Sequence, residues 1–400
     1  MSDRNTRQII EQIADTLDIP ESAYEKAELR YKDLGEWFGR PEAACAGNKP
    51  HIYSQGSFRL GTVIRPLLEG EEYDLDVGCR LCDGITKETH TQKELKALVG
   101  KDIENYRKAR GIESATEEMH RCWRLRYKDE LSFHMDVVPS IPEQARQRQM
   151  IKEAMISHGI SDSLAAAVAS HAGSITDDRH PGYAFITPDW RISNSEGYAR
   201  WFESRMKLAK ALMEKRAFAA NAAQVEDLPT RKWKSPLQRC VQILKRHRDV
   251  MFADAPDGKP ISVIITTLAG AAYQGEQDME SALDRILTDM GQHVRPTSPR
   301  VPNPVNPVED FADKWSEPKS RHLNLEHNFW TWLSQAQADF RILAQSRDPK
   351  VIVEQARTKF ASALDGDSLR KALGLTSVNI ITEPKSHRIA DAPAKPWSCA

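Results

Sequence analysis

The sequence lacks three features that would each define a class of protein. It has no run of about 18 apolar residues, the length that a membrane-spanning helix requires. Its formal net charge is -1, so no overall positive field attracts nucleic acid. Its first ten residues, MSDRNTRQII, lack the apolar core of a secretory signal peptide. We therefore expect neither a membrane span nor strong nucleic-acid binding.

Cysteine is also scarce. Six cysteines are scattered over 400 residues without forming a disulfide framework, so we expect a reducing, cytoplasmic location. Cys79 and Cys82 form a lone CxxC pair, and two ordinary thiols are favoured there over a zinc site. The sequence contains no internal repeat and no low-complexity block. Its apolar content of 40% is enough for one large or two medium domains.

The most informative stretch is GSFRLGTVIRPLLEGEEYDLDVG, at residues 56–78. The YDLDV part alternates as a strand does, which places Asp74 and Asp76 together on one face. Two adjacent carboxylates repel each other, and a divalent cation removes that repulsion; oxygen ligands suit Mg²⁺ or Mn²⁺. Upstream, Gly56 permits close backbone approach and Ser57 offers a hydroxyl group, as a phosphate site requires. The stretch predicts a site for a metal-chelated nucleoside triphosphate.

A third acid follows in the second strand of a predicted hairpin, whose strands cover 122–127 and 131–138. Asp136 lies in the apolar sequence SFHMDVVPS, where a buried carboxylate needs a partner. An ion pair with Arg124 or Arg126 on the neighbouring strand is one explanation. A metal shared with the first two acids is the other, and the presence of those acids favours it.

Helical periodicity covers much of the remaining chain. Helices are predicted near residues 3–17, 93–110, 146–158, 161–172, 199–218, 237–251 and 261–273, with two more between the proline-rich stretch 293–308 and the tail. Ser22 and Glu25 predict a capping box at the start of another helix. On the helix at 237–251, the cations Arg239, Lys245, Arg246 and Arg248 are expected to form a solvated face.

The segment 181–201, PGYAFITPDWRISNSEGYARW, is predicted to be a loop because it contains proline, asparagine and glycine. Its aromatic residues Tyr183, Trp190 and Tyr198 could stack on a nucleotide base. Trp190 and Asn194 are the two residues selected as candidates for base contact. The alternative is that the aromatic residues of this loop anchor it by packing.

Together these motifs resemble the polymerase-β-like nucleotidyltransferases, in which Gly-Ser precedes an Asp-x-Asp pair and a later third acid. More narrowly, the chain resembles the bacterial CD-NTases, the cGAS-like enzymes of CBASS anti-phage systems. The narrower resemblance depends on GSFRLGTVIRP, HMDVVPSIP, Leu244-Lys245 and the segment NPVNPVEDFADKW at 303–315. It covers roughly residues 20 to 345.

The resemblance implies an α+β fold: a two-lobed nucleotidyltransferase core, with a mixed sheet and helices, plus a helical C-terminal lobe. The implied divisions are N-terminal helices that bridge the lobes (1–38), the nucleotidyltransferase core (39–197), the helical lobe (198–380) and a flexible tail (381–400).

The resemblance also implies a role for each site residue. Ser57 and the backbone of Gly56 would hold the β- and γ-phosphates, and Lys245 would contact the triphosphate. Asp74 and Asp76 would bind two Mg²⁺ or Mn²⁺ ions, and Asp136 would bind the catalytic one. The implied activity joins ATP and other NTPs into a cyclic di- or trinucleotide. No role follows for His134.

The resemblance further implies a partner at the C-terminus. A ubiquitin-transfer-like enzyme would join the terminal residue, Ala400, to a target. The alternative is a disordered end without a role.

Two other functions stay open from the sequence. A related enzyme could add nucleotides to RNA or tRNA, although the balanced charge gives no sign of an RNA-binding surface. A nucleotide sensor without catalysis is the other, although binding alone would not require all three acids.

Overall fold

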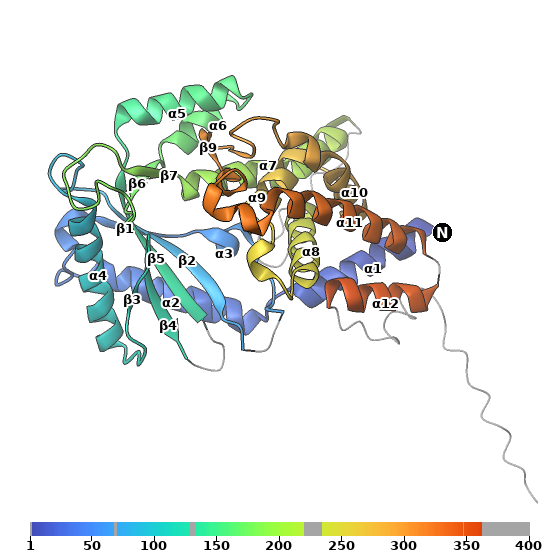
Figure 1. The fold of residues 1–400 in the computed structure, drawn as a ribbon, viewed down its shortest axis with the longest axis horizontal. Coiled ribbons are helices and arrows are strands. Elements are labelled where there is room, and N and C mark those ends of the chain that lie inside the picture. Colours follow the sequence, from blue (N-terminus) through green and yellow to red (C-terminus); the bar gives the residue numbers. More distant parts are fainter. Residues whose placement is uncertain (1, 68–69, 129–132, 220–233, 347, 362–400) are drawn as a thin grey trace, which may run out of the picture.

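The computed structural model describes residues 2–67, 70–128, 133–219, 234–346 and 348–361. Figure 1 shows a twisted sheet flanked by helices at one end of the molecule and a group of helices at the other. The predicted α+β class, a mixed sheet with helices and a helical C-terminal part, is therefore confirmed.

The sheet has seven strands in the described part of the chain. They are β1 (Pro50–Ser54), β2 (Tyr73–Leu81), β3 (Glu117–Glu118), β4 (Trp123–Tyr127), β5 (Phe133–Pro142), β6 (Gly173–Ile175) and β7 (Arg191–Ser193). The order is β1-β2-β5-β4-β3, and β6 pairs with both β5 and β7. The pair β2–β5 is parallel and the other pairs are antiparallel, so two strands distant in sequence run side by side at the centre.

Two helices cover one face of this sheet. Helices α2 (Glu21–Phe38) and α4 (Gln92–Ala109) bury their apolar residues against those of the central strands. Helix α4 begins with a capping box, in which Thr91 and Glu94 satisfy each other's backbone N–H groups. The opposite face of β2 and β5 carries the polar side chains.

The helical part has its own apolar core. It contains α1 (Ser2–Leu17), α5 (Ala145–Ser157), α6 (Asp162–Ala169), α7 (Ser195–Ala219), α8 (Pro236–Met251), α9 (Ser262–Ala272), α10 (Met279–Asp289), α11 (Leu325–Gln345) and α12 (Pro349–Phe360). The short helix α3 (Gly56–Leu60) follows β1, and a two-stranded sheet pairs β8 (Pro302–Asn303) with β9 (Asn306–Asp310). Five 3-10 turns cover Ala46–Asn48, Pro256–Gly258, Met290–His293, Asp313–Trp315 and Pro318–Leu323.

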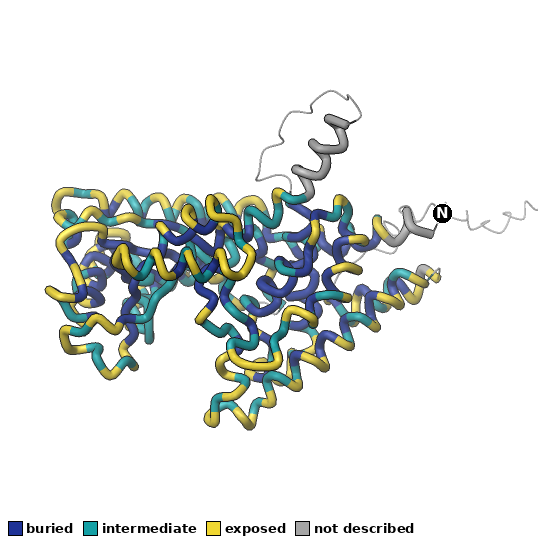
Figure 2. The backbone as a smooth tube through the Cα atoms, turned by 90° about the horizontal axis from the view of Figure 1, so that it is seen from above, coloured by how far each residue is buried: buried dark blue, intermediate teal, exposed yellow. Residues whose placement is uncertain are grey.

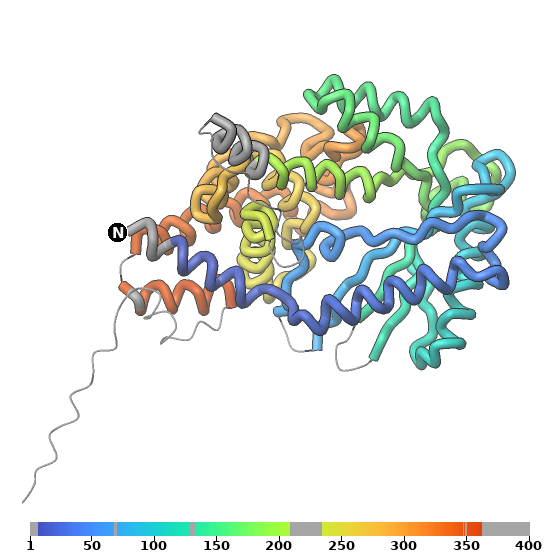
Figure 3. The backbone as a smooth tube through the Cα atoms, turned by 180° about the vertical axis from the view of Figure 1, so that it is seen from behind, coloured from blue at the N-terminus to red at the C-terminus, as the bar shows by residue number. Residues whose placement is uncertain are grey.

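The first two helices connect the two cores. The buried residues of α1 belong to the helical core, and those of α2 belong to the sheet core. Seen from behind, the two helices run one after the other along the molecule (Figure 3). Both parts contain buried residues, and exposed residues lie mainly on the outer faces of the helices and in loops (Figure 2).

The predicted helices at 3–17, 93–110 and 237–251 are confirmed as α1, α4 and α8. Two local predictions are wrong. Helix α2 already begins at Glu21 after Pro20, so Ser22 lies inside its first turn and forms no capping box. The segment 181–201 is only partly a loop, because β7 adds to the sheet edge and α7 starts at Ser195.

No helix in the described part of the chain is both long enough and apolar enough to cross a bilayer. The predicted tail, 381–400, and part of the predicted helical lobe, 362–380, lie outside the described residues.

Candidate active site

Strand β2 presents two aspartates on one face of the sheet. Leu75 and Val77 are buried in the core, whereas the side chain of Asp74 is 52% exposed. The alternation of a strand places Asp76 on the same face as Asp74. The predicted separation of the acids from their apolar neighbours is therefore confirmed.

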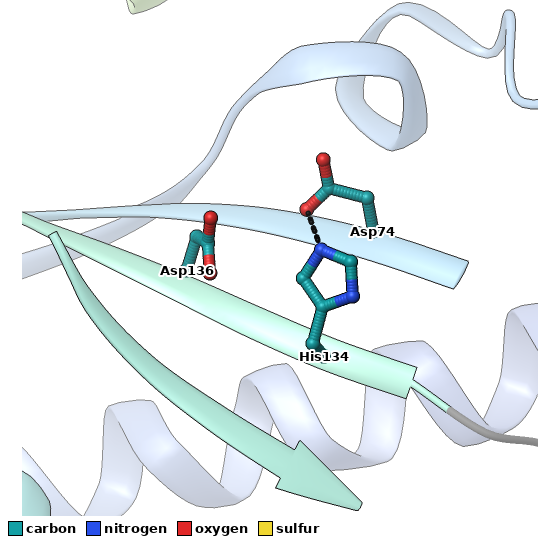
Figure 4. A group of neighbouring side chains, drawn as sticks. All are labelled: Asp74, His134 and Asp136. Atoms are coloured by element: carbon teal, nitrogen blue, oxygen red, sulfur yellow. Dashed lines mark ion pairs between the residues drawn. The ribbon is translucent and has the colours of Figure 1, made fainter. Parts of the chain in front are cut away.

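Strand β5 brings a third carboxylate to this face (Figure 4). In the parallel register of β2 and β5, Asp76 lies opposite Asp136 and Asp74 lies opposite His134. One ligand atom from each of Asp74, His134 and Asp136 lies within 4.8 Å of the others. Asp76 is not part of this group of three, but it pairs with Asp136 in the register and feels the charges of both Asp74 and Asp136, so the three acids that the sequence analysis selected are neighbours.

The clustering changes the pKa of Asp76. Burial, together with the charges of Asp74 and Asp136, raises the pKa of its carboxyl group to about 7. The cluster therefore holds more negative charge than the surrounding protein offsets. Carboxylate oxygens with surplus negative charge are the ligands that Mg²⁺ and Mn²⁺ prefer, so these residues fit such ions.

Asp136 also forms the ion pair that the sequence analysis gave as the alternative. Both carboxylate oxygens accept hydrogen bonds from Arg124, with Nε–Oδ1 and Nη2–Oδ2 distances of 2.7 Å. Arg124 is the register partner of Asp136 on β4, which flanks β5 on the side away from β2. The arginine therefore orients Asp136 without separating it from Asp76, and each oxygen keeps a further lone pair for another ligand.

His134 lies between two acids. Its Nε2 is 3.1 Å from Oδ1 of Asp74, and its Nδ1 is 3.1 Å from Oε2 of Glu72. The contact with Asp74 raises the pKa of His134 against the opposing effect of burial. Arg126 holds Glu72 in turn, with a 2.6 Å hydrogen bond from Nη1. No pattern in the sequence indicates this chain of contacts, because it depends on the β2–β5 register.

The Gly-Ser turn lies directly against the acids. Gly56 has φ +62°, and a Cβ atom there would lie 1.9 Å from Oδ2 of Asp76. The backbone N–H of Gln55 donates to the carbonyl oxygen of Asp76 at 2.9 Å. Glycine is therefore required both by the backbone angle and by the close approach. The following residue, Ser57, lines the same cleft.

Lys245 reaches this site from the helical part. Its side chain is only 6% exposed, and its Nζ donates to the carbonyl oxygen of Thr62 at 2.9 Å. Burial, together with the nearby positive charge of Arg248, lowers the pKa of Lys245 to about 7. Lys245 lines the cleft together with Ser57 and both acids of β2.

The predicted solvated face of this helix is wrong. Lys245, Arg246 and Arg248 are 4–6% exposed because one side of α8 packs in the helical core and another side contacts the chain after α3. Their charged groups donate to backbone carbonyl oxygens, which supplies the partners that burial demands. Arg239 instead pairs with Asp15 and Asp18.

Asp74, Asp76 and the Gly-Ser turn open into a cleft of about 1160 Å³ that both parts of the molecule line, and Asp136 lies beside Asp76 on the neighbouring strand. Pockets for drug-sized ligands span roughly 300–1,000 Å³, so this cleft has room for more than one nucleotide. From the helical part it receives residues to which the sequence analysis gave no role, among them Thr266, Asn303, Glu309 and Phe311. The last three fall in the 303–315 segment, so the only signal for them was the family resemblance.

Trp190 and Asn194, the two candidates for base contact, both make contacts within the protein. Trp190 is 4% exposed in the sheet core and is not among the described residues that line the cleft. Asn194 does line the cleft, but its amide donates to the carbonyl of Val168 and accepts from the N–H of Gly197, each at 3.0 Å. The structure therefore does not support base stacking by Trp190. The side chain of Asn194 forms its hydrogen bonds with backbone groups of α6 and of the start of α7.

Comparison with known proteins gives consistent matches. Residues 50–139 match the family model "Cyclic GMP-AMP synthase DncV-like, nucleotidyltransferase domain". A c-di-GMP synthase of Roseivirga ehrenbergii is 25% identical over 372 residues, which cover 89% of this chain and 88% of that protein. The cyclic dinucleotide synthase CdnG of Bradyrhizobium diazoefficiens is 26% identical over 338 residues, or 79% of this chain and 73% of that protein.

A solved structure shows the same fold. The Bradyrhizobium diazoefficiens CD-NTase CdnG, in complex with GTP, superposes with a TM-score of 0.62 at 21% identity. The superposition covers 92% of this chain and 98% of that chain.

The close approach of Gly56 gives a first prediction. Gly56→Ala should weaken Mn²⁺ binding roughly 10- to 100-fold, because the new methyl group displaces the carboxylate of Asp76. Titration of Mn²⁺ into the purified protein measures this. The matched control is Gly111→Ala, where φ is +63° but a Cβ atom meets nothing within 4 Å. Equal losses in both variants would show that backbone strain alone is responsible.

The raised pKa of Asp76 gives a second prediction. An acid whose folded pKa lies above its unfolded value of 3.8 stabilises the fold at low pH and loses that contribution as the pH rises through about 7. Asp76→Asn should therefore stabilise the protein in EDTA, by about 1–2 kcal/mol at pH 8 and by less at pH 5. Thermal unfolding at both pH values checks this. A gain independent of pH would contradict it.

Proposed function

Because the chain belongs to the CD-NTases, a family of nucleotidyltransferases, we propose that it joins nucleoside triphosphates into a cyclic di- or trinucleotide. The observation that supports this most is the convergence of Asp74, Asp76 and Asp136 on one face of β2 and β5, where Asp74, Asp76 and the Gly56–Ser57 turn line a cleft with room for more than one nucleotide.

The residues of the cleft fit the separate parts of such a reaction. Ser57 and the backbone of Gly56 bind the β- and γ-phosphates, and Lys245 adds a positive charge beside them. The carboxylates of Asp74, Asp76 and Asp136 hold two Mg²⁺ or Mn²⁺ ions. Bound there, these ions neutralise charge on the attacking and leaving oxygens of an in-line displacement.

Asp136 holds and orients the attacking ribose hydroxyl group. Its two hydrogen bonds from Arg124 fix the plane of the carboxylate, so a remaining lone pair points in a constant direction. The hydroxyl oxygen attacks the α-phosphorus, the bond to the bridging oxygen breaks, and pyrophosphate leaves. The proton of the hydroxyl group passes to a carboxylate of this cluster or to solvent.

A second round of the same reaction closes the ring. The linear dinucleotide must turn so that its own triphosphate occupies the place of the first one. A cleft of about 1160 Å³ leaves room for this rearrangement.

The names of the relatives point to a cyclic dinucleotide as the product, and one of them points to guanine as its base. One is named c-di-GMP synthase and another cyclic dinucleotide synthase. The use of ATP, which the family resemblance implies, stays a prediction. Mass spectrometry of the nuclease-resistant product from a mixture of all four NTPs identifies the bases and the ring size.

The cellular role follows only from the family. We propose that the product signals in anti-phage defence. The conjugation at Ala400 concerns a residue outside the described part of the chain, so it also stays a prediction.

The proposed reaction predicts that Asp74→Ala or Asp76→Ala abolishes product formation, with a loss of roughly 10³-fold or more, because the remaining acids cannot hold both ions. Chromatographic separation of labelled NTP products in Mg²⁺ or Mn²⁺ measures this. The control is Asp284→Ala, at an exposed position on α10, which should leave the rate unchanged.

Three outcomes would contradict the proposal. An active Asp74→Ala/Asp76→Ala double mutant would remove the acids from the mechanism. A product that forms only when an RNA primer is added would favour an RNA-extending enzyme, and ATP binding without turnover would favour a sensor.

A further inference from the structure

The chain between α3 and residue 66 is bound by one helix of the other part of the molecule. Residues 60–65, which we call the 60–65 segment, follow the Gly-Ser turn directly. Four side chains of α8 donate hydrogen bonds to its backbone carbonyl oxygens. The pairs are Gln238 with Leu60, Lys245 with Thr62, Gln242 with Val63, and Arg246 with Arg65.

The spacing of these four donors along the sequence places them on one side of helix α8. They occupy positions i, i+4, i+7 and i+8, which fall on the same side of an α-helix. Residues 61–66 belong to no helix or strand, so their carbonyl groups need partners from elsewhere. Helix α8 supplies those partners at distances of 2.9 Å for Leu60, 2.9 Å for Thr62 and 2.6 Å for Val63.

The contact is closest at Gly61. Its φ is +66°, and a Cβ atom there would lie 2.4 Å from Nε2 of Gln238. The absence of a side chain at this position therefore lets the Gln238 amide reach the carbonyl oxygen of Leu60.

The 60–65 segment is joined in turn to the phosphate-binding turn. The N–H of Thr62 donates to the carbonyl oxygen of Ser57 at 2.9 Å, and the N–H of Gly61 donates to that of Phe58 at 3.2 Å. At the other end, the N–H of Arg65 donates to the carbonyl oxygen of Leu17 at 2.9 Å. The segment is thus fixed at both ends, and its position sets the position of Ser57.

We propose that Gln238 and Gln242 are positioning residues that hold Ser57 in place for the triphosphate through the 60–65 segment. Neither residue is required to touch the nucleotide. This inference rests on the proposed function, because it assigns the triphosphate to the Gly56–Ser57 turn.

One substitution removes the hydrogen bond from Gln238 to Leu60 but keeps the cap that starts helix α8. The Oε1 atom of Gln238 accepts from the N–H and the hydroxyl group of Ser235, at 2.8 and 3.1 Å, in the capping box of α8. A glutamate at this position keeps that acceptor and is favourable in the first turn of a helix. Gln238→Glu therefore keeps the cap, removes the amide donor and places a negatively charged oxygen opposite the carbonyl of Leu60. The uncharged variant Gln242→Met separates the loss of a donor from the effect of the added charge.

The chain also offers a matched control. Gln337 on α11 donates from Nε2 to the carbonyl oxygen of Leu287 at 2.7 Å, a bond of the same chemical kind within the helical part. Gln337→Glu makes the same chemical change without touching the 60–65 segment. A second test variant, Gln242→Met, keeps the side-chain length and removes the donor to the carbonyl oxygen of Val63, together with the hydrogen bond from the same nitrogen to Oδ1 of Asp18.

The experiment measures binding of GMP and of a nonhydrolysable α,β-methylene analogue of GTP, each with Mg²⁺, to the full chain. Gln238→Glu should weaken binding of the triphosphate analogue roughly three- to tenfold, the value of one hydrogen bond, and change GMP binding less than about twofold. Gln242→Met should change the ratio of the two affinities in the same direction. Gln337→Glu should leave the ratio unchanged.

The outcomes separate this inference from the proposed function. If wild-type protein prefers the triphosphate and both test variants keep the full preference, the inference is wrong and the proposed function stands. Equal weakening of both ligands would mean a purely structural role and would also overturn it. A wild-type protein without any preference for the triphosphate would overturn both.

Discussion

Three carboxylates on one face of two parallel strands repel one another, and the neighbouring groups are arranged around that repulsion. Arg124 neutralises Asp136 from the strand on one side, and His134 lies against Asp74. Asp76 forms no ion pair with any residue that the structure describes, and its pKa is raised to about 7. The cost of ionising the three acids is therefore concentrated at Asp76, directly against the Gly-Ser turn. A fold that keeps this arrangement sacrifices stability in exchange for affinity toward cations.

The site lies at the boundary of two separate apolar cores, and this location explains its composition. The sheet core fixes the acids through the β2–β5 register, while the helical core fixes Lys245 and the far wall of the cleft. Neither core alone contains both the acids and the lysine. Helix α8 therefore has two structural tasks, since its apolar side completes the helical core and its polar side contacts the sheet part.

Much of the site was predictable because its signals are local in sequence. The alternation of YDLDV, the Gly-Ser pair and the acid within an apolar strand each have a direct physical meaning. The partner of Asp136 was predictable as well, because a hairpin places Arg124 on the adjacent strand. The burial of Lys245 and Arg246 was not predictable, since periodicity identifies a polar helix face but not what packs on it. Backbone carbonyl groups, their partners here, leave no trace in a sequence pattern. The same limit applies to Trp190, whose environment depends on distant strands.

The hydrogen bonds between α8 and the 60–65 segment end on main-chain oxygens, which every amino acid possesses. Recognition of this kind does not depend on the identity of the side chains in the segment. During evolution, Thr62, Val63 or Arg65 could be exchanged for other residues while the bonds from α8 persist, whereas Gly61 and Gln238 could change only together. Covariation in this enzyme should therefore link a glycine of the loop to an amide on a helix more than 170 positions later in the chain.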